Sequence, residues 1–462
     1  MKVLFAAYEA TPIYKVGGLG DVAGSLPKAL KRLGVDIRLV MPGYSFIQKV
    51  PFLPGSEVPV YYLSHPRYFQ KEQTVVTDWQ SHKQFAWFSR QILESLPTWD
   101  FWPDIIHLND WHPALAAVIL KNIFAKDKRY AKIATVLTIH NLAYQGISSL
   151  NILRLTGLDK HPCCVLRWDK ENRDIDILME GIIHADFVNT VSPTYAREIL
   201  TKKFGEGLDK VLKGKEGKVV GILNGVDYEI WNPQEDKILP HRYGVSDWKG
   251  GKKRNKLVLQ KKLGLSTGRR PLIGMIARLN CQKGLDFLLL EERGKSLLER
   301  IINLGAQVVI LGKGEKAYTK KLNLLEKKLK KQGAFRFIDR FDEDLAHLIY
   351  AASDIFLMPS RFEPCGLVQI IAMRYGSLPL AHKTGGLADT IRDQVTGFLF
   401  SKCESCEFLK RVQVAVNLYF KDQKQWEEMV KRAMREDFSL EESAREYLRL
   451  YQRTLSLKKE TK

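Results

Sequence analysis

Short runs of consecutive apolar residues alternate with longer amphipathic segments over most of this chain. The first half predicts buried strands at residues 2–7, 36–41, 104–108, 132–139 and 187–191. Helices are predicted over residues 20–33 and from near Pro113. Strands that are apolar throughout and alternate with helices are typical of parallel sheets covered on both faces. The pattern therefore predicts an α/β fold.

The alternation pauses over residues 227–251, which contain Trp231-Asn232-Pro233 and Lys249-Gly250-Gly251. Such a segment is typical of a linker between domains. A basic helix is predicted at 252–263, and strands then return at 272–277, 308–311, 335–338 and 355–359. Further helices are predicted at 285–304, 318–331, 344–352, 368–374 and, with an amphipathic pattern, near 440–457. We expect domains over residues 1–240 and 252–438, the two α/β halves of a bilobal enzyme with a cleft between them.

Length and charge narrow the function class. A chain of 462 residues is long enough for two or three domains, and its six cysteines are too sparse to indicate a disulfide framework. The 72 Lys and Arg residues outnumber the 52 Asp and Glu residues, and the net charge of +20 favours polyanions or phosphorylated small molecules. No basic–aromatic module indicates nucleic-acid binding, and no apolar run approaches the ~20 residues of a membrane span. We expect a cytoplasmic protein without nucleic-acid or membrane partners, whose basic segments at 252–262 and 320–331 are solvated helix faces.

One motif occurs twice, each time where a loop enters a predicted helix. Lys15-Val16-Gly17-Gly18-Leu19-Gly20-Asp21 is echoed by Lys383-Thr384-Gly385-Gly386-Leu387-Ala388-Asp389. Adjacent glycines let a backbone approach a ligand, and the first N–H groups of a helix favour an anion. For either copy alone, the alternative is a tight turn whose aspartate favours the helix N-terminus. Two copies, one in each half and each with a lysine, indicate that both halves grip one phosphorylated ligand.

Charged residues follow two predicted strands of the second half, where open α/β sheets bind ligands. Arg278 and Lys283 could neutralise a departing diphosphate without a metal. A solvated basic loop is the alternative. Glu363 could accept sugar hydroxyls or balance charge at a reacting anomeric carbon, and the alternative is a helix-capping acid. Cys365 has no adjacent base, so we interpret it as a residue that lines a pocket rather than as a nucleophile.

Histidines and an aspartate end two strands of the first half. His107, Asp110 and His112 could be metal ligands, but a strand-to-helix transition would point them in different directions. Asp110 as a helix N-cap is the alternative. His140 either hydrogen-bonds a substrate hydroxyl or is a satisfied core histidine.

Two short motifs carry weaker signals. The pair Cys403-x-x-Cys406 has no second pair at zinc spacing, so no metal site is expected there. Residues 312–317 read Gly-Lys-Gly-Glu-Lys-Ala, which resembles the dinucleotide fingerprint. That fingerprint usually opens the first βαβ unit, so a nicotinamide dehydrogenase stays an alternative on this motif alone.

Taken together, these motifs resemble those of bacterial glycogen synthases and plant starch synthases, the retaining ADP-glucose glucosyltransferases of glycosyltransferase family 5. The resemblance extends over segments 15–21, 107–112, 140–146, 190–195, 224–227, 278–286, 359–376 and 384–389, in the family's order. It implies two Rossmann-like domains facing across a cleft, the GT-B fold, with a final helix at 439–462 that crosses back to the N-terminal domain. It also implies transfer of glucose from ADP-glucose to the non-reducing end of an α-1,4-glucan such as glycogen, with retention of configuration and with no cofactor or metal.

The resemblance implies roles for individual residues. The catalytic residues would be His140, Glu363, Arg278 and Lys283: His140 contacts the transferred glucose, Glu363 holds its hydroxyls, and the two cations hold the diphosphate as ADP leaves. Phe341 would pack near adenine, Asp110 and Asn224 would line the sugar pocket, and Thr384 and Gly385 would offer backbone N–H groups to the diphosphate. The implied substrate-binding residues are Lys15, Gly17, Gly18, Asp110, Asn224, Phe341, Cys365, Gly366, Thr384 and Gly385.

The chain departs from the family pattern at two positions, and at a third it follows the bacterial synthases rather than related retaining families. Asn109 stands where the family often has His, and Asn280 where it often has Thr or Val; neither carries a charge that the reaction needs. Ile371 occupies the place where related retaining families have a second glutamate, which weakens any two-carboxylate mechanism. Two different functions stay possible on the same motifs: a transferase that uses UDP- or GDP-sugar, and a non-catalytic glucan-binding protein. The sequence indicates no oligomeric state.

Overall fold

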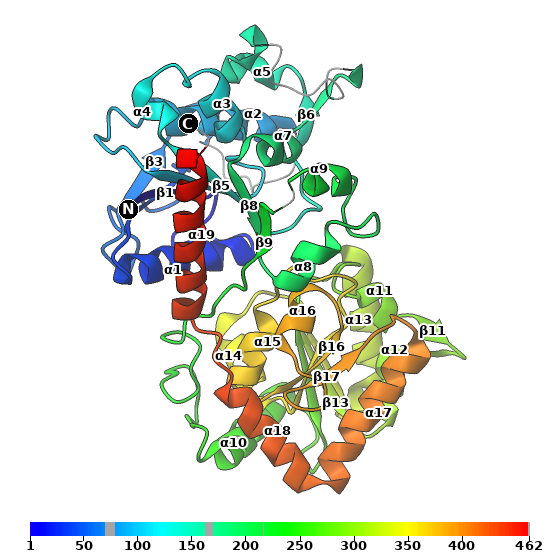
Figure 1. Cartoon of the computed structure of the whole chain (residues 1–462). Helices are drawn as coiled ribbons and strands as arrows, with labels where there is room; N and C mark the ends of the chain where they lie inside the picture. The colour runs from blue at the N-terminus through cyan, green and yellow to red at the C-terminus, as the bar shows by residue number, and fades with distance from the viewer. Residues whose placement is uncertain (70–78, 162–168, 170, 216, 461–462) are drawn as a thin grey trace. The chain divides into compact units, whose positions relative to one another are not determined.

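The computed structural model describes residues 1–69, 79–161, 169, 171–215 and 217–460 (Figure 1). The chain divides into two compact units: unit 1 is Met1–Gly225 with Ser439–Lys462, and unit 2 is Val226–Phe438. The expected boundary at residue 240 is therefore wrong. Residues 226–240 belong to unit 2 because Val226 and Leu239 are buried in its core.

Unit 1 is built on a seven-stranded sheet in the order β3-β2-β1-β4-β5-β8-β9, in which every neighbouring pair is parallel. Its strands are β1 (Lys2–Ala6), β2 (Asp36–Pro42), β3 (Val60–Leu63), β4 (Ile105–Asn109), β5 (Ala134–Ile139), β8 (Phe187–Thr190) and β9 (Val219–Gly221). A separate antiparallel ribbon consists of β6 (Ile147–Ser149) and β7 (Asp174–Asp176). The five strands predicted for this half are all present.

Helices cover both faces of this sheet. They are α1 (Gly18–Arg32), α2 (Trp79–Glu94), α3 (Leu115–Asn122), α4 (Lys128–Ala131), α5 (Ile152–Thr156), η1 (Leu158–Lys160), α7 (Ile177–His184), α8 (Pro193–Glu198), α9 (Asp209–Lys213) and α19 (Leu440–Glu460). Successive residues of β1 point to opposite faces: Val3 and Phe5 pack with α1 and α19, whereas Leu4 and Ala6 pack with α2 and α3. The last helix, α19, lies beside the first, α1 (Figure 1).

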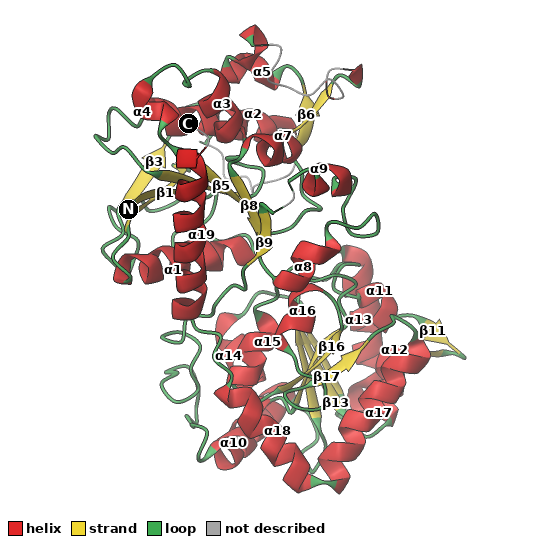
Figure 2. Cartoon of the chain, viewed as in Figure 1, coloured by secondary structure: helices red, strands yellow, loops and turns green. Residues whose placement is uncertain are grey.

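Unit 2 has a six-stranded parallel sheet in the order β14-β13-β10-β15-β16-β17. Its strands are β10 (Leu272–Ile276), β13 (Gln307–Leu311), β14 (Phe335–Ile338), β15 (Ile355–Met358), β16 (Leu378–His382) and β17 (Phe398–Phe400). Its helices include α10 (Trp248–Leu263), α13 (Lys316–Leu329), η3 (Lys330–Gln332), α14 (Glu343–Ala352), α15 (Val368–Arg374), α16 (Gly385–Thr390), α17 (Ser405–Lys421) and α18 (Gln423–Arg435). Figure 2 shows these helices arranged around the strands. The strand order is the doubly wound order of a Rossmann fold.

The single helix expected over residues 285–304 is interrupted by a hairpin. The segment forms α11 (Leu285–Leu288), the antiparallel strands β11 (Glu291–Glu292) and β12 (Lys295–Ser296), and α12 (Leu297–Asn303). The turn between the strands holds Arg293 and Gly294 at φ +54° and +74°, values that a helix does not contain. Ser296 and Glu299 then form a capping box that begins α12. The prediction failed because the apolar spacing on both sides of the turn fits one helix.

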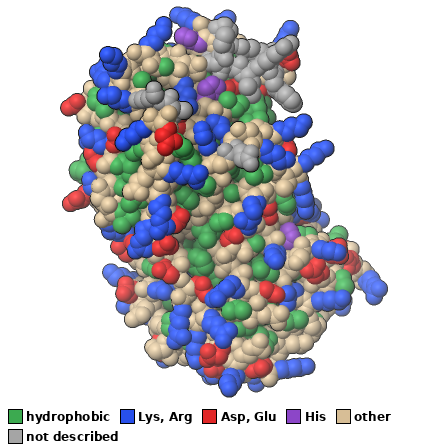
Figure 3. Space-filling view, in the orientation of Figure 1, with side chains coloured by type: hydrophobic (Ala, Val, Ile, Leu, Met, Phe, Trp, Pro, Cys, Tyr) green, Lys and Arg blue, Asp and Glu red, His purple; other side chains and the backbone are tan. Residues whose placement is uncertain are grey.

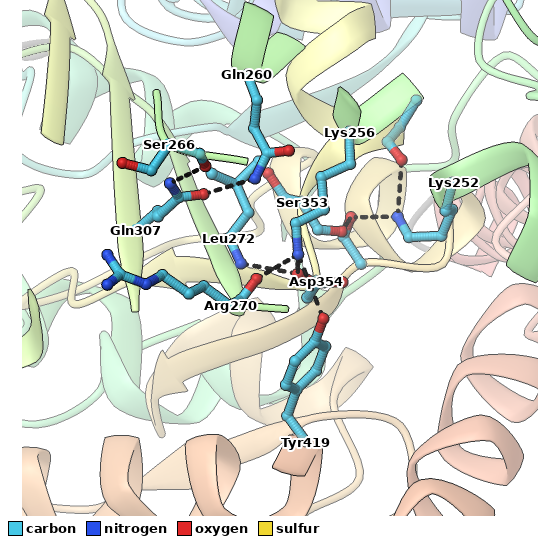
Figure 4. A network of polar contacts seen from close by, with 12 residues as sticks. Lys252, Lys256, Gln260, Ser266, Arg270, Leu272, Gln307, Ser353, Asp354 and Tyr419 are labelled. Carbon is cyan, nitrogen blue, oxygen red and sulfur yellow. Dashed lines mark hydrogen bonds and ion pairs between the residues drawn. The ribbon is translucent and has the colours of Figure 1, made fainter. Parts of the chain in front are cut away.

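The basic helix α10 is not the solvated face that its composition predicts. Lys252 and Lys256 are 5% and 9% exposed. Nζ of Lys252 donates to the carbonyl oxygens of Tyr375, at 2.9 Å, and Ala351, at 3.1 Å, which lie at the C-terminal ends of α15 and α14. Nζ of Lys256 pairs with Asp354 at 2.6 Å (Figure 4). These lysines therefore satisfy buried carbonyl and carboxylate groups, and burial lowers the pKa of Lys252 to about 7.

Charges of both signs are interspersed on the surface. On the face drawn in Figure 3, Lys and Arg side chains are scattered among Asp and Glu side chains rather than gathered in one patch. Within the described residues, no helix is both long enough and apolar enough to cross a membrane.

Candidate active site

The strand order of each unit places its polar loops at one edge of the sheet. In a doubly wound sheet, ligands bind at the carboxyl ends of the strands where the strand order reverses. In unit 1 that point lies between β1 and β4, which are followed by the segment of Glu9 and by Asp110. In unit 2 it lies between β10 and β15, which are followed by the segments of Lys283 and Glu363. The predicted site residues thus gather at the edge where each sheet would bind a ligand.

In unit 1, Glu9 occupies the loop that the first Gly-Gly motif forms. Its carboxylate is fully buried, and Oε2 accepts the backbone N–H groups of Val16 and of Gly17, the latter at 2.8 Å. Lys15 is turned toward its own helix and pairs with Asp21 at 2.6 Å. The Gly17 amide, expected to face a bound anion, therefore donates its hydrogen bond to Glu9 in this structure. Burial raises the pKa of Glu9, while the two amides lower it.

Asp110 and His140 are brought together at the ends of β4 and β5. Asp110 has a left-handed backbone, with φ +59°, and its Oδ1 accepts the backbone N–H of His140 at 2.7 Å. Burial raises the pKa of Asp110 to about 7 and lowers that of His140 to about 3. The ring of His140 lies 3.0 Å from the amide of Asn109, measured from Nε2 to Oδ1. His140 is therefore neutral and held at both its backbone and its ring.

His107 and His112 have structural partners. The ring of His107 lies between the hydroxyls of Thr138, at 2.6 Å, and Tyr451, at 2.7 Å, and so connects β4 and β5 to α19. His112 stacks on Tyr8 with ring centroids 3.6 Å apart. Among the described residues no three His, Cys, Asp or Glu side chains are grouped so as to hold a metal ion.

Asn224 lies just after β9 and is 7% exposed. Its Oδ1 is buried without a hydrogen-bond partner in the described part of the chain. Buried amide oxygens are nearly always hydrogen-bonded, so this one has room for a donor from a ligand. The observation is compatible with the predicted sugar-binding role.

In unit 2, Lys283 and Glu363 are in direct contact. Nζ of Lys283 lies 2.5 Å from Oε2 of Glu363, which is 5% exposed, and the hydroxyl of Ser360 donates to the same oxygen at 3.0 Å. The two loops are also joined by the N–H of Arg361, which donates to the carbonyl of Gln282 at 2.8 Å. A cation and a carboxylate are thus fixed side by side at the ends of β10 and β15.

The second Gly-Gly motif packs against the loop that carries Glu363. A Cβ at Gly385 would lie 2.0 Å from the carbonyl oxygen of Glu363, and one at Gly386 would lie 2.2 Å from that of Cys365. The glycines therefore allow two loops to approach each other, where the sequence predicted the approach of a ligand. The N–H of Thr384, expected to face the diphosphate, donates to the carbonyl of His382 at 2.9 Å. The two copies of the motif are also not equivalent, because one follows β1 and the other follows β16.

The remaining predicted residues of unit 2 differ in exposure. Arg278 is exposed at the end of β10, and Phe341 is 76% exposed just before α14. Cys365 is a buried thiol, and Gly366 has φ +74°. The glycines of the dinucleotide-like motif pack on the Arg278 loop: a Cβ at Gly314 would lie 2.3 Å from the carbonyl oxygen of Leu279. Loop packing alone thus accounts for that motif.

Comparison with known proteins gives a consistent result. The profile of starch synthase catalytic domains matches residues 2–214, and that of group 1 glycosyl transferases matches residues 259–434. The glycogen synthases of Thermosipho melanesiensis and Syntrophotalea carbinolica are 39% and 40% identical, with 99% of both chains covered. The chain belongs to the glycogen synthase family. The structure of the starch synthase IV catalytic domain from Arabidopsis thaliana, bound to ADP and acarbose, matches with a TM-score of 0.89 and 36% identity, covering 98% of this chain and 99% of that one.

Membership of this family confirms the predicted fold class, two Rossmann-like domains in the GT-B fold, and makes the chain a glycosyltransferase. Sequence reasoning assigned no contact to three residues that hold the clusters together: Glu9, Asn109 and Ser360. Glu9 follows the first strand of a doubly wound sheet, and that position is the signal that could have identified it. Asn109 adjoins Asp110, but its hydrogen bond to His140 depends on a tertiary contact that spacing does not reveal. Ser360 precedes Glu363 by three residues, and its hydrogen bond depends on the local loop conformation.

Proposed function

We propose that this glycosyltransferase moves glucose from ADP-glucose to the non-reducing end of an α-1,4-glucan in glycogen biosynthesis, with retention of configuration. In formal terms it is an ADP-glucose:1,4-α-D-glucan 4-α-D-glucosyltransferase. The observation that carries the proposal is the match to glycogen synthases over 99% of the chain. The ion pair of Lys283 and Glu363 in unit 2 agrees with it. The ADP in the Arabidopsis relative supports the choice of nucleotide. We keep the cytoplasm as the predicted compartment.

Glu363 is built to hold the transferred sugar. Both hydrogen bonds that it accepts from Lys283 and Ser360 go to Oε2. In the described part of the chain this leaves Oε1 to accept hydroxyls of the glucose ring. Because the carboxylate is buried and held by two hydrogen bonds, it is fixed in place near the reacting carbon.

Lys283 and Arg278 stabilise the charge that grows on the diphosphate as ADP leaves. A cation fixed in advance in a partly dry site stabilises developing charge without reorganisation. ADP leaves on the face that the acceptor hydroxyl enters, and its phosphate takes the proton of that hydroxyl. Ile371 stands where related retaining families have a second glutamate, so we assign the role of the base to the phosphate rather than to a second carboxylate. We propose that the two cations make a metal unnecessary.

The test is release of ADP from ADP-glucose, with and without glycogen, repeated with UDP-glucose and with a chelator. We expect glycogen-dependent release from ADP-glucose that the chelator leaves unchanged, and a product with an α-anomeric linkage by NMR. Faster turnover of UDP-glucose would favour a transferase with a different donor. Binding of glycogen without ADP release would favour a non-catalytic glucan-binding protein, and stabilisation by NAD(H) would favour a dehydrogenase.

Substituting the cation next to Glu363 tests the mechanism. Lys283→Ala should lower kcat by about 10²–10³, the effect of removing one preorganised donor to a developing anion, with a smaller change in the KM for glycogen. Lys402→Ala is the matched control, because the Lys402 side chain is 70% exposed and its contact with Glu404, at 3.9 Å, is long and weak. Turnover of Lys283→Ala close to that of the control would contradict the role of Lys283.

A further inference from the structure

Asn109 is buried at the end of β4, and the backbone fixes which way its amide points. The side chain is 0% exposed, and Nδ2 lies 3.0 Å from the carbonyl oxygen of Ala6 on β1. A carbonyl oxygen only accepts hydrogen bonds, so the amide NH₂ group must face Ala6. The amide oxygen, Oδ1, must then face the opposite way, toward His140.

The amide oxygen in turn fixes the proton on His140. Oδ1 of Asn109 lies 3.0 Å from Nε2 of His140 and only accepts, so Nε2 carries the proton. In a neutral imidazole the other nitrogen, Nδ1, is then an acceptor. Burial keeps the ring neutral, since it lowers the pKa of His140 to about 3. The backbone N–H of His140 donates to Asp110, which fixes the backbone that carries the ring.

We propose that Asn109 is a positioning residue that holds His140 in its Nε2–H tautomer, so that Nδ1 accepts a hydrogen bond from a hydroxyl of the transferred sugar. The inference rests on the proposed function for the contact between His140 and the sugar. The control of the tautomer rests on the geometry of unit 1 alone. On this proposal Asn109, which stands where the family often has His, contributes to the site by fixing the tautomer of His140.

The same geometry explains which side chains can replace Asn109. A neutral imidazole also offers one N–H donor and one acceptor nitrogen, so Asn109→His can donate to Ala6 and accept from His140. Asn109→Leu has the same branching and the same number of side-chain heavy atoms but offers neither group. The matched control is Asn189→Leu, because Asn189 is a buried amide of the same sheet that bonds to Thr138 and Tyr447, not to His140.

The first experiment observes the ring nitrogens of the full-length protein labelled with ¹⁵N-histidine, using long-range ¹H–¹⁵N correlations. The chain has 10 histidines, and the signals absent from a His140→Gln variant identify His140. We expect the Nε2–H tautomer in the wild type, in Asn109→His and in Asn189→Leu, and a mixture of both tautomers in Asn109→Leu. If Asn109→Leu does not fold, Asn109→Ser replaces it, because the serine side chain is one bond shorter and no longer reaches the ring.

The second experiment measures kcat and KM with ADP-glucose and with donors in which one glucose hydroxyl at a time is replaced by hydrogen. In the wild type, one of these deoxy donors should lower kcat/KM by about three- to tenfold, the size of one neutral hydrogen bond. With ADP-glucose, the kcat/KM of Asn109→Leu should be lower than that of the wild type by a similar factor. Replacing ADP-glucose by that deoxy donor should not lower the kcat/KM of Asn109→Leu further. Asn109→His should restore the wild-type pattern.

Three results would overturn the proposal. They are the Nδ1–H tautomer in the wild type, an unchanged tautomer in Asn109→Leu, and equal losses of kcat/KM in Asn109→Leu and Asn189→Leu per folded protein. A wild-type protein that transfers no glucose would refute the proposed function, and with it the sugar contact. The NMR comparison would still decide whether Asn109 sets the tautomer of His140, so the two failures are distinguishable.

Discussion

Replacing Gly385 by alanine should displace the loop that carries Glu363. Gly385 has φ +44°, and a Cβ built there would lie 2.0 Å from the carbonyl oxygen of Glu363. A left-handed backbone costs a residue with a Cβ about 1–2 kcal/mol. The contact is also about 1.5 Å inside the usual ~3.5 Å separation, and crowding of this kind costs about 1–3 kcal/mol. The two effects together predict a loss of about 2–5 kcal/mol in the free energy of unfolding of unit 2.

Calorimetry of the full-length protein is the appropriate assay, because a two-domain chain need not unfold in one step. For a domain of about 200 residues, 1 kcal/mol lowers the melting temperature by roughly 2–4 °C, so Gly385→Ala should lower that of unit 2 by about 4–20 °C. The crystal or solution structure of the variant should show the Glu363 carbonyl moved away from position 385. Since Lys283 is held 2.5 Å from Glu363, turnover should fall as well.

Gly250→Ala is the control in the same unit. Gly250 is exposed within α10, and a Cβ there would meet nothing within 4 Å. Gly250 lies in the first turn of α10, where alanine gains at most the roughly 1 kcal/mol by which a helix interior favours it over glycine, so this variant should keep or slightly raise the stability. The reasoning is refuted if Gly385→Ala melts with the wild type, or if Gly250→Ala is equally destabilised.

Two further predictions concern buried titratable groups. Lys252→Met should lower the melting temperature of unit 2 at pH 7, because the carbonyl of Ala351 loses its side-chain donor, at about 1–3 kcal/mol, and that of Tyr375 keeps only the hydroxyl of Tyr243. Lys249→Met, whose side chain is 68% exposed, should change the melting temperature little, and equal effects of the two variants would contradict this. Burial lowers the pKa of His107 to about 3 in the folded state, below its unfolded value near 6.5. The free energy by which neutral His107 stabilises the fold is therefore fully present above pH 6.5. It is lost as the pH falls toward 3, by up to about 1.4 kcal/mol per pH unit. The difference in unfolding free energy between the wild type and His107→Gln should therefore shrink from pH 7 to pH 4, and a difference independent of pH would count against a buried neutral histidine.

The sheet strands could be predicted because burial on both faces makes each of them a continuous apolar run. Residues 2–7 and 272–277 are examples, and β1 and β10 differ from these ranges by only one residue at the end. The hairpin within residues 285–304 was missed because a turn at Arg293 and Gly294 leaves the apolar spacing unchanged. Burial of Lys252 was missed for another reason: its partners are helix-end carbonyls about 100 residues away in the sequence.

The candidate site was predicted in outline, since polar residues after apolar strands must lie at one edge of a parallel sheet. This logic selected Asp110, His140, Lys283 and Glu363, which the structure places at those edges. It did not reveal that the Gly17 amide serves Glu9, or that Gly385 packs on a neighbouring loop. Spacing indicates that a backbone comes close to something, but not what it approaches.

The position of α19 has a consequence for synthesis of the chain. Unit 1 contains segments from both sides of unit 2 in the sequence, and Tyr451 of α19 closes a hydrogen bond with His107 in the interior. Ribosomes add about 5–20 residues per second, so the roughly 210 residues of unit 2 separate Gly225 from α19 by about 10–40 s. During that interval the face of unit 1 that receives α19 is bare apolar surface, including Phe5 and Leu30. The first unit to be translated is therefore completed only after the whole of unit 2 has been synthesised, and until then this face needs protection from aggregation.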